Sequence, residues 1–457
     1  MSEYRIETDS MGEVQVPHRA FYGAQTQRAV DNFAISGLTM PKQLIAAIAL
    51  IKHAAATANQ EVAGLKASKA KAIRNVAKQI YEGQFADQFP IDIFQTGSGT
   101  SSNMNVNEVI AHLASSDDLN VHPNDDVNCS QSSNDTIPTA IQLSAVLALK
   151  EHFAPALAHL IGRIKEKAGQ LQNHVKTGRT HLMDAMPMTL AQELNSWAAQ
   201  LEVSQRQLPL LIEQLSELPQ GGTAIGTGIN APEQFAEHFS RALSELTDHH
   251  FKPAENFFSG IAGQERSLAA SSLLNSIATT LLKISNDLRW MNSGPLAGLG
   301  EIQLEALQPG SSIMPGKVNP VIPEAVAMVA AQVNGNHTTI TTAAQQGNFQ
   351  LNVMLPVIAY NLLQSIEIVS TSCMHLADKA IQSFEVNQDR LDEALSKNPI
   401  LVTALNTEIG YNKAAEIAKR AYKEKRPVLD VADEMTDLGR DKLAQLLDPK
   451  KLTKGGV

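Results

Sequence analysis

Apolar residues recur every three or four positions along several long stretches of the chain. Two of these stripes consist of Leu190, Leu194, Trp197, Leu201, Leu208, Leu211, Leu215 and Leu218, and of Leu274, Ile277, Leu281, Ile284, Leu288 and Met291. This spacing is typical of long helices that pack side by side. Residues 136–175 and 323–375 also have a helical pattern, with Pro138 and Pro323 suited to first turns. The pattern therefore predicts a central bundle of long helices.

The two ends of the chain carry shorter helical patterns. The first 130 residues contain one at 43–59, and turn-forming residues break up the rest: Pro41, Gly64, Gly83 and Pro90. Beyond residues 398–399, Asn-Pro, the apolar stripes are short and lysine is frequent. We therefore predict an all-α protein with three domains. These are a small N-terminal helical domain at 1–131, the central long-helix bundle at 132–388 and a small C-terminal helical domain at 389–457.

The composition narrows the class of protein. The chain has 457 residues, a formal net charge of -10 and two cysteines, Cys129 and Cys373. The negative charge argues against nucleic acid or an anionic membrane as a partner. Two cysteines cannot build a disulfide framework or a four-cysteine iron–sulfur cluster. The apolar run at 44–51 is too short to cross a bilayer, and residues 1–7 show no targeting pattern. We expect a cytoplasmic protein without membrane or nucleic-acid partners.

Four segments rich in glycine, serine, threonine and asparagine interrupt the predicted helices, at 96–103, 122–135, 178–181 and 294–320. The first two precede helical patterns. Their hydroxyl and backbone N–H groups would therefore collect at positive helix ends, which can receive a carboxylate. Turns with ordinary helix caps are the alternative explanation.

The other two segments offer groups for acid–base chemistry. His181 ends the third segment and can exchange a proton near neutral pH. The fourth segment is a long connection without periodicity, and such connections are usually either functional or disordered. Its core places the hydroxyls of Ser311 and Ser312 ahead of Lys317. A mobile surface loop is the alternative interpretation.

Nucleotide and metal motifs match the chain poorly. Residues 310–317 resemble a phosphate-binding loop, but five residues separate the glycines and Val318 stands where serine or threonine is required. Residues 226–231 fit the relaxed G-x-G-x-x-A pattern, yet a helical stripe rather than a strand precedes them. The adjacent His249 and His250 lack the spacing and companion carboxylates of a metal site. We expect neither a metal nor a cofactor.

The loop Gly310-Ser-Ser-Ile-Met-Pro-Gly-Lys-Val-Asn-Pro320 resembles the signature sequence of the fumarase/aspartase superfamily. Further segments that resemble this family, in the family's order, are 21–27, 96–105, 122–125, 178–181, 221–228 and 401–406. Aspartases usually carry GRTQ and IMPAKVNP where this chain has His181 and Gly316, and STND where it has SSND at 132–135. These differences indicate the class II fumarases within the superfamily.

The resemblance implies an all-α, three-domain fold whose long helices form the common core of a homotetramer, with active sites shared between three subunits. It implies a reversible trans hydration of fumarate to L-malate, as in the tricarboxylic acid cycle, without a cofactor. Ser311 would be the catalytic base. His181 would protonate the departing hydroxyl or activate the incoming water, with Glu324 as its carboxylate partner.

The resemblance also assigns residues to binding. The substrate-binding residues would be Ser98, Gly99, Thr100, Ser132, Ser133, Asn134, Thr180, Ser312, Lys317, Val318 and Asn319. A secondary anion site would consist of His122, Pro123, Asn124 and Asp125. Removal of the C3 proton of malate leaves two negative charges on one end of the substrate. Lys317 and the loop N–H groups should therefore supply positive potential there.

The chain departs from the family's usual pattern in three places. Cys129 stands where lysine is common, Met183 stands where glutamine is common, and residues 304–308 are less polar than usual. The first change removes a positive charge near the second polar segment. All three leave the expected catalytic residues intact.

Three other functions remain open. A lyase of the same fold, such as an aspartase, would release ammonia, and His181 is the residue that argues against it. A helical scaffold without catalysis would not need Ser311, His181 and Lys317 together. A nucleotide-dependent dehydrogenase would need a strand before Gly226.

Overall fold

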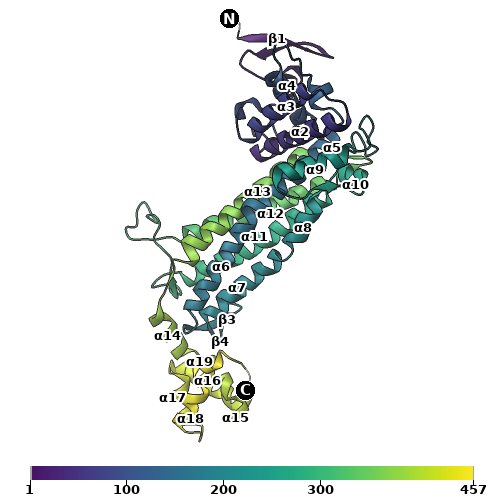
Figure 1. Ribbon diagram of the computed structural model, residues 1–457. Coiled ribbons are helices and arrows are strands. Elements are labelled where there is room, and N and C mark those ends of the chain that lie inside the picture. Colours follow the sequence, from purple (N-terminus) through teal and green to yellow (C-terminus); the bar gives the residue numbers. More distant parts are fainter. Residues whose placement is uncertain (1–2, 456–457) are drawn as a thin grey trace. The chain divides into compact units, whose positions relative to one another are not determined.

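The computed structural model describes residues 3–455, which are mainly helical (Figure 1). The first two and last two residues of the predicted terminal domains lie outside this range. The chain divides into two compact units. Unit one comprises residues 1–155, 206–278 and 331–370, and unit two comprises residues 156–205, 279–330 and 371–457. The long helices α11 (Glu265–Met291), α12 (Val321–Ala344) and α13 (Leu355–Leu376) contribute residues to both units.

Unit one begins with a β-hairpin that packs on a group of helices. The hairpin consists of β1 (Tyr4–Asp9) and β2 (Gly12–Pro17). The elements that follow in unit one are α1 (Ala24–Asn32), α2 (Lys42–Val62), α3 (Ala67–Tyr81), a 3-10 turn (Ala86–Gln88), α4 (Thr100–Ala114), a π-helical turn η2 (Pro123–Val127), α5 (Ser133–Ala148), a π-helical turn (Leu149–Phe153), α8 (Leu208–Leu215), β5 (Glu217–Leu218), α9 (Phe235–Thr247), β6 (Lys252–Pro253), α10 (Phe257–Ala262), β8 (Gly347–Asn348) and β9 (Leu351–Asn352).

Helix α2 is the centre of unit one. It packs against α3, α4, α5 and α9 (Figure 1). Its sequence is apolar on nearly every face, which is typical of a helix enclosed by neighbours. Leu44, Ile48 and Ile51 are fully buried, and so are the polar side chains of Lys52 and Asn59. Two polar groups inside an apolar helix need partners, and these lie in the candidate site.

Unit two combines a hairpin with short helices. Its further elements are α6 (Ala154–Gln170), β3 (Val175–Thr180), β4 (Met183–Thr189), α7 (Leu190–Gln205), β7 (Ile302–Gln303), a π-helical turn (Ala377–Ile381), β10 (Glu385–Val386), α14 (Gln388–Lys397), a 3-10 helix (Pro399–Leu405), α15 (Asn406–Ile409), α16 (Tyr411–Glu424), α17 (Val428–Met435), α18 (Arg440–Leu446) and α19 (Pro449–Leu452). Residues of the last helices share one apolar cluster, with Leu405, Ile417, Val431 and Leu443 fully buried. These helices gather at the C-terminal end of the chain (Figure 1).

The prediction of an all-helical fold is confirmed, because the strands form only two-stranded sheets in the described part of the chain. Several boundaries were predicted wrongly. The leucine stripe from 190 to 218 crosses a break between α7 and α8, and the stripe from 323 to 375 is interrupted by the β8–β9 hairpin. Pro323 lies in the first turn of α12, whereas Pro138 lies deeper inside α5. The domain boundaries at 131 and 388 stay a prediction.

No helix among residues 3–455 is both long and apolar enough to cross a membrane. The cytoplasmic location stays a prediction of the sequence.

Replacing Ile417 by alanine is expected to lower the free energy of unfolding of the C-terminal cluster by about 2–5 kcal/mol, because it leaves a cavity among fully buried residues. Hydrogen exchange of the α16 and α17 amides measures this change. Tyr422→Ala on the same helix is the control, since Tyr422 is 77% exposed and its loss should change stability by less than about 0.5 kcal/mol. Equal effects of the two variants would contradict the assignment of this core.

Candidate functional site

The first polar segment turns sharply into α4. Gly99 adopts a left-handed backbone with φ of 71° immediately before the helix begins at Thr100. A side chain there would also collide with Ile137, since a Cβ atom would lie 2.9 Å from it. This turn brings the hydroxyl oxygens of Ser98 and Thr100 to 2.8 Å from each other. Glycine is therefore required for the two hydroxyls to meet at the N-terminus of α4.

The second polar segment caps α5 with its own side chains. Ser132 Oγ accepts from the backbone N–H of Asn134 at 3.2 Å, and Asp135 Oδ1 accepts from the backbone N–H of Ser132 at 2.9 Å. This reciprocal arrangement is a capping box. It places the side chains of Ser132, Ser133 and Asn134 at the positive end of a long helix, where negative charge is stabilised.

A buried carboxylate fastens this helix end to the loop at 221–224. Asp135 Oδ2 accepts from the backbone N–H groups of Gly221 at 3.0 Å and Thr223 at 2.8 Å. The side-chain amide of Asn134 donates to the carbonyl of Ala224 at 2.8 Å. Residues 221–224, which belong to one of the segments that resemble the superfamily, are thus structural neighbours of the α5 N-terminus.

Asn103 joins the first two polar segments. Its Nδ2 lies on α4 and donates to Ser133 Oγ at 2.9 Å. Unit one therefore brings together hydroxyls from Ser98, Thr100, Ser132 and Ser133 at the starts of two helices. Sequence analysis predicted both segments but not the asparagine that links them.

Lys52 and Asp135 are fully buried groups of opposite charge behind this site. Burial lowers the pKa of Lys52 to about 7, and the charge of Asp135 partly opposes this effect. Burial also raises the pKa of Asp135 to about 6, although its three backbone N–H donors favour the carboxylate. Sequence analysis missed Lys52. Its position as the one charged residue within the apolar stretch 43–60 was the available signal.

The third polar segment lies on the β3–β4 hairpin of unit two. His181 and Leu182 form its two-residue turn, with φ of 56° and 61°. Consecutive left-handed residues are typical of the tight turn that matches strand twist. Thr180 and His181 are exposed at the hairpin tip. This geometry is uncommon for residues other than glycine, and such positions are frequent at functional sites.

A buried charge network anchors the base of this hairpin. Lys176 Nζ lies 2.6 Å from Glu193 Oε2 and 3.0 Å from Glu301 Oε2. Arg179 pairs with the other oxygen of Glu301 at 2.5 Å. Glu301 stands at the start of β7, within the connection that leads to Ser311. The network thus ties the hairpin of His181 to the root of the fourth segment, which sequence analysis did not foresee.

A cavity of about 560 Å³ lies beside this network. Its lining residues are Lys176, Gly178, Arg179, His181, Leu182, Met188, Glu193, Lys283, Asp287, Trp290, Met291 and Leu299. Cationic, acidic and apolar side chains all contribute to the lining, and His181 is one of these residues.

The fourth segment closes on itself around Ser311. Ser311 Oγ accepts from the backbone N–H groups of Ile313 at 3.2 Å and Met314 at 3.1 Å. The N–H of Gly310 donates to the carbonyl of Lys317 at 2.8 Å, and Asn319 Nδ2 donates to the carbonyl of Gly310 at 2.7 Å. The hydroxyl is held in a small nest of donors, which is an arrangement that stabilises negative charge on oxygen.

Other predicted residues of this segment point toward solvent. Ser312, Lys317 and Val318 are exposed, and the Lys317 ammonium makes no ion pair with a described residue. Glu324 lies in the first turn of α12. Among the described residues of unit two, no hydrogen bond joins Ser311, His181 or Glu324 to one another. The structure therefore positions these groups without bringing them into contact.

The predicted secondary anion site lies on the π-helical turn η2. His122 Nδ1 accepts from the backbone N–H groups of Asn124 at 3.3 Å and Asp125 at 3.2 Å, so the imidazole already occupies the donors that an anion would use. His122, Pro123 and Asn124 border a cavity of about 710 Å³. This secondary anion site stays a prediction.

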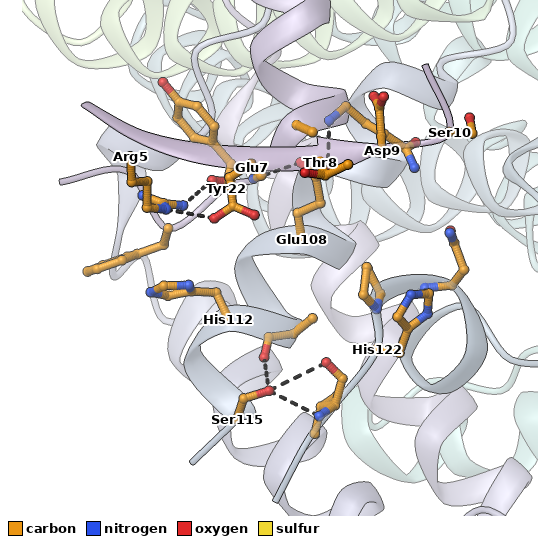
Figure 2. Close-up of a pocket in the computed structure, with 18 of the residues that line it drawn as sticks. Arg5, Glu7, Thr8, Asp9, Ser10, Tyr22, Glu108, His112, Ser115 and His122 are labelled. Atoms are coloured by element: carbon orange, nitrogen blue, oxygen red, sulfur yellow. Dashed lines mark hydrogen bonds and ion pairs between the residues drawn. The ribbon is translucent and has the colours of Figure 1, made fainter. Parts of the chain in front are cut away.

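Figure 2 shows that acidic groups share this cavity with Arg5, His112 and His122. The carboxylate of Glu108 already accepts hydrogen bonds from the backbone N–H groups of Gly23 at 2.9 Å and Thr26 at 3.1 Å. Glu7 lies beside Arg5 at 2.7 Å. The cavity offers a mixed lining rather than a positive one.

Comparisons with known proteins match the chain over its full length. The family model described as Lyase covers residues 12–335, and that described as Fumarase C C-terminus covers residues 401–454. The chain is 58% identical to Fumarate hydratase class II 2 of Pseudomonas aeruginosa, with 100% of both chains covered. It is 45% identical to Fumarate hydratase class II of Bacillus subtilis, with 99% of both covered. The crystal structure of the class II fumarase of Schistosoma mansoni matches with a TM-score of 0.96 at 39% identity, covering 99% of each chain.

Wild-type stability is expected to rise relative to that of Lys52→Met as the pH increases from 7 to 9. In the unfolded chain Lys52 has its ordinary pKa of 10.5 and stays protonated throughout this range. In the folded chain its pKa is about 7, so Lys52 increasingly loses its proton as the pH rises. The unfolded state then binds more protons, so the free energy of unfolding rises by up to about 1.4 kcal/mol per pH unit. Denaturant unfolding of both proteins at pH 7, 8 and 9 measures it. A difference that stays constant with pH would contradict the burial of this ammonium.

Proposed function

Because the chain belongs to the lyase family that contains the class II fumarases, and is therefore a hydro-lyase, we propose that it hydrates fumarate reversibly to L-malate. The addition is trans, and the reaction is the fumarate hydratase step of the tricarboxylic acid cycle. Helical fold, family match and the order of the four polar segments all support this reaction over that of a scaffold or a nucleotide-dependent dehydrogenase.

The proposal rests mainly on the surroundings of the Ser311 hydroxyl, which accepts two backbone hydrogen bonds. A serine is a weak base unless its alkoxide is stabilised, and the N–H groups of Ile313 and Met314 point at this oxygen. In the dehydration direction, Ser311 takes the C3 proton of malate and leaves an aci-carboxylate. His181 then gives a proton to the C2 hydroxyl, which departs as water while the double bond forms. Glu324 serves as the carboxylate partner of His181.

Two groups of side chains hold the dicarboxylate. Hydroxyl, amide and backbone donors at the α4 and α5 N-termini bind one end, from Ser98, Gly99, Thr100, Ser132, Ser133 and Asn134. The second group binds near the reacting carbons and comprises Thr180, Ser312, Lys317, Val318 and Asn319. The exposed Lys317 supports a role toward a substrate carboxylate, since its ammonium pairs with no carboxylate among residues 3–455. Loss of one such donor raises the barrier by about 3 kcal/mol.

The active sites are shared between subunits of a homotetramer. Large apolar side chains on the helices support this assembly, because Trp290 on α11, Met328 on α12 and Leu210 on the short helix α8 are exposed in a single chain. Residues 122–125 act as a secondary anion site when His122 turns away and frees the backbone N–H groups of Asn124 and Asp125.

Purified protein treated with a chelator is expected to convert L-malate into a product that absorbs in the ultraviolet as fumarate does. The same protein should release no fumarate from L-aspartate, because His181 stands where aspartases carry glutamine. Absorbance with each substrate measures both activities. Activity with aspartate alone would assign the chain to ammonia release, and inactivity with malate would refute the hydration.

Ser311→Ala is expected to lower kcat/KM for malate by about 10²- to 10⁴-fold, which is the range for loss of a positioned base. Leu296→Ala is the matched control, because Leu296 lies in the same long connection and is 89% exposed. Steady-state kinetics of the two variants separates them. If Ser311→Ala turns over at the wild-type rate, another group is the base, although the reaction class stands.

A further inference from the structure

A lysine ammonium lies behind the proposed carboxylate site with no exposure to solvent. Lys52 Nζ donates to Asn128 Oδ1 at 3.0 Å and to Gln131 Oε1 at 2.9 Å. It forms no ion pair within 4.0 Å among the described residues. In its protonated form, which prevails below pH 7, Lys52 can only donate hydrogen bonds, so in this form both amide side chains turn their oxygen atoms toward it.

The oxygen of Asn128 collects two further donors. Asn103 Nδ2 lies 3.2 Å from Asn128 Oδ1, and Asn107 Nδ2 lies 3.1 Å from it. Because Lys52 fixes Asn128 as an acceptor, Asn103 must present its NH₂ group there. The opposite orientation would set two amide oxygens against each other. The orientation persists although the buried Asn103 Oδ1 has no hydrogen-bond partner in the described chain.

The same NH₂ group of Asn103 faces Ser133. Asn103 Nδ2 donates to Ser133 Oγ at 2.9 Å, so the serine oxygen accepts on this side. The Ser133 hydroxyl proton is bonded to no acceptor among the described residues. Ser133 is therefore left as a donor toward whatever lies beyond the α5 N-terminus.

We propose that Lys52 is a positioning residue that fixes the direction of these hydrogen bonds, so that Ser133 donates its proton to a substrate carboxylate. The order of donation runs from Lys52 to Asn128, while Asn103 donates both to Asn128 and to Ser133. An ionised carboxylate has only acceptor atoms, so a hydroxyl held as a donor matches it. The identity of the bound anion rests on the proposed function, whereas the hydrogen-bond order does not.

Gln131 and Asn59 hold the same turn from the other side. Gln131 Nε2 donates to the carbonyls of Val127 at 3.1 Å and Cys129 at 3.0 Å, and Asn59 Nδ2 donates to the carbonyl of Cys129 at 2.8 Å. The lysine donor and the backbone carbonyl acceptors thus determine which way the side-chain amides of Gln131 and Asn59 are turned. Cys129 takes part in these bonds through its backbone carbonyl alone.

Asn103→Asp reverses the polarity at one point with little change of shape. The aspartate would accept the Ser133 proton and withdraw it from the substrate. We expect KM for fumarate to rise about tenfold or more, with a smaller change in kcat, as for loss of one hydrogen bond to a charged group. Asn105→Asp is the matched control, because Asn105 is also buried on α4 but points to another side of the helix and donates to the carbonyl of Gln88, not to the network.

A Ser133→Ala background isolates the effect that depends on the serine proton. If the order of donation is correct, Asn103→Asp changes KM by less than about threefold once Ser133 is absent. An equal rise in KM with and without Ser133, an equal rise in Asn105→Asp, or no rise at all would each overturn the proposal.

A second double-mutant cycle measures stability and does not depend on catalytic activity. Lys52→Met and Asn103→Leu each remove one donor to Asn128 Oδ1, so their effects on the denaturant midpoint should be non-additive when combined. If wild-type protein fails to hydrate fumarate, the proposed function falls, and this cycle alone decides the role of Lys52. Additive effects would then overturn the hydrogen-bond order, and coupled effects would retain it.

Discussion

The fully buried carboxylate of Asp135 is the constraint on which the rest of unit one's site depends. It accepts from the backbone N–H groups of Ser132, Gly221 and Thr223, which belong to two segments far apart in sequence. A buried charge is tolerated only with such saturation, so the helix start and the loop must meet at this point. This junction places Ser132 and Ser133 at the start of α5, and α2 contributes the buried Lys52 nearby.

In unit two, a buried carboxylate also joins two segments that are far apart in sequence, but its partners are cationic side chains. Glu301 receives Lys176 and Arg179 from the hairpin, which fixes the strand that carries His181. The loop of Ser311, by contrast, is held mainly by bonds within itself, through Gly310, Lys317 and Asn319. The hairpin is thus held by ion pairs to another segment, whereas the Ser311 loop is held mainly by its own hydrogen bonds.

Much of this arrangement could be predicted from the sequence. The stripe ending at Met291 marked α11, and the polar segment 122–135 ahead of a helical pattern marked the start of a helix, because both depend on local periodicity and local hydrogen bonds. The β3–β4 hairpin was not predicted, since its strands include Gly178 and Pro187 and are short. The partners of Lys52 and Glu301 lie about 75 or more residues away, and a single sequence carries no signal of such pairings.

The proposed hydration is a stereospecific addition in which one base and one acid act from opposite faces of the substrate. Proton NMR of the malate formed from fumarate in D₂O tests this geometry, because the coupling between the C2 and C3 protons reports which C3 position received deuterium. A trans addition gives a single diastereomer of 3-deuteriomalate. Deuterium distributed over both C3 positions during a single addition, or the diastereomer of cis addition, would contradict it.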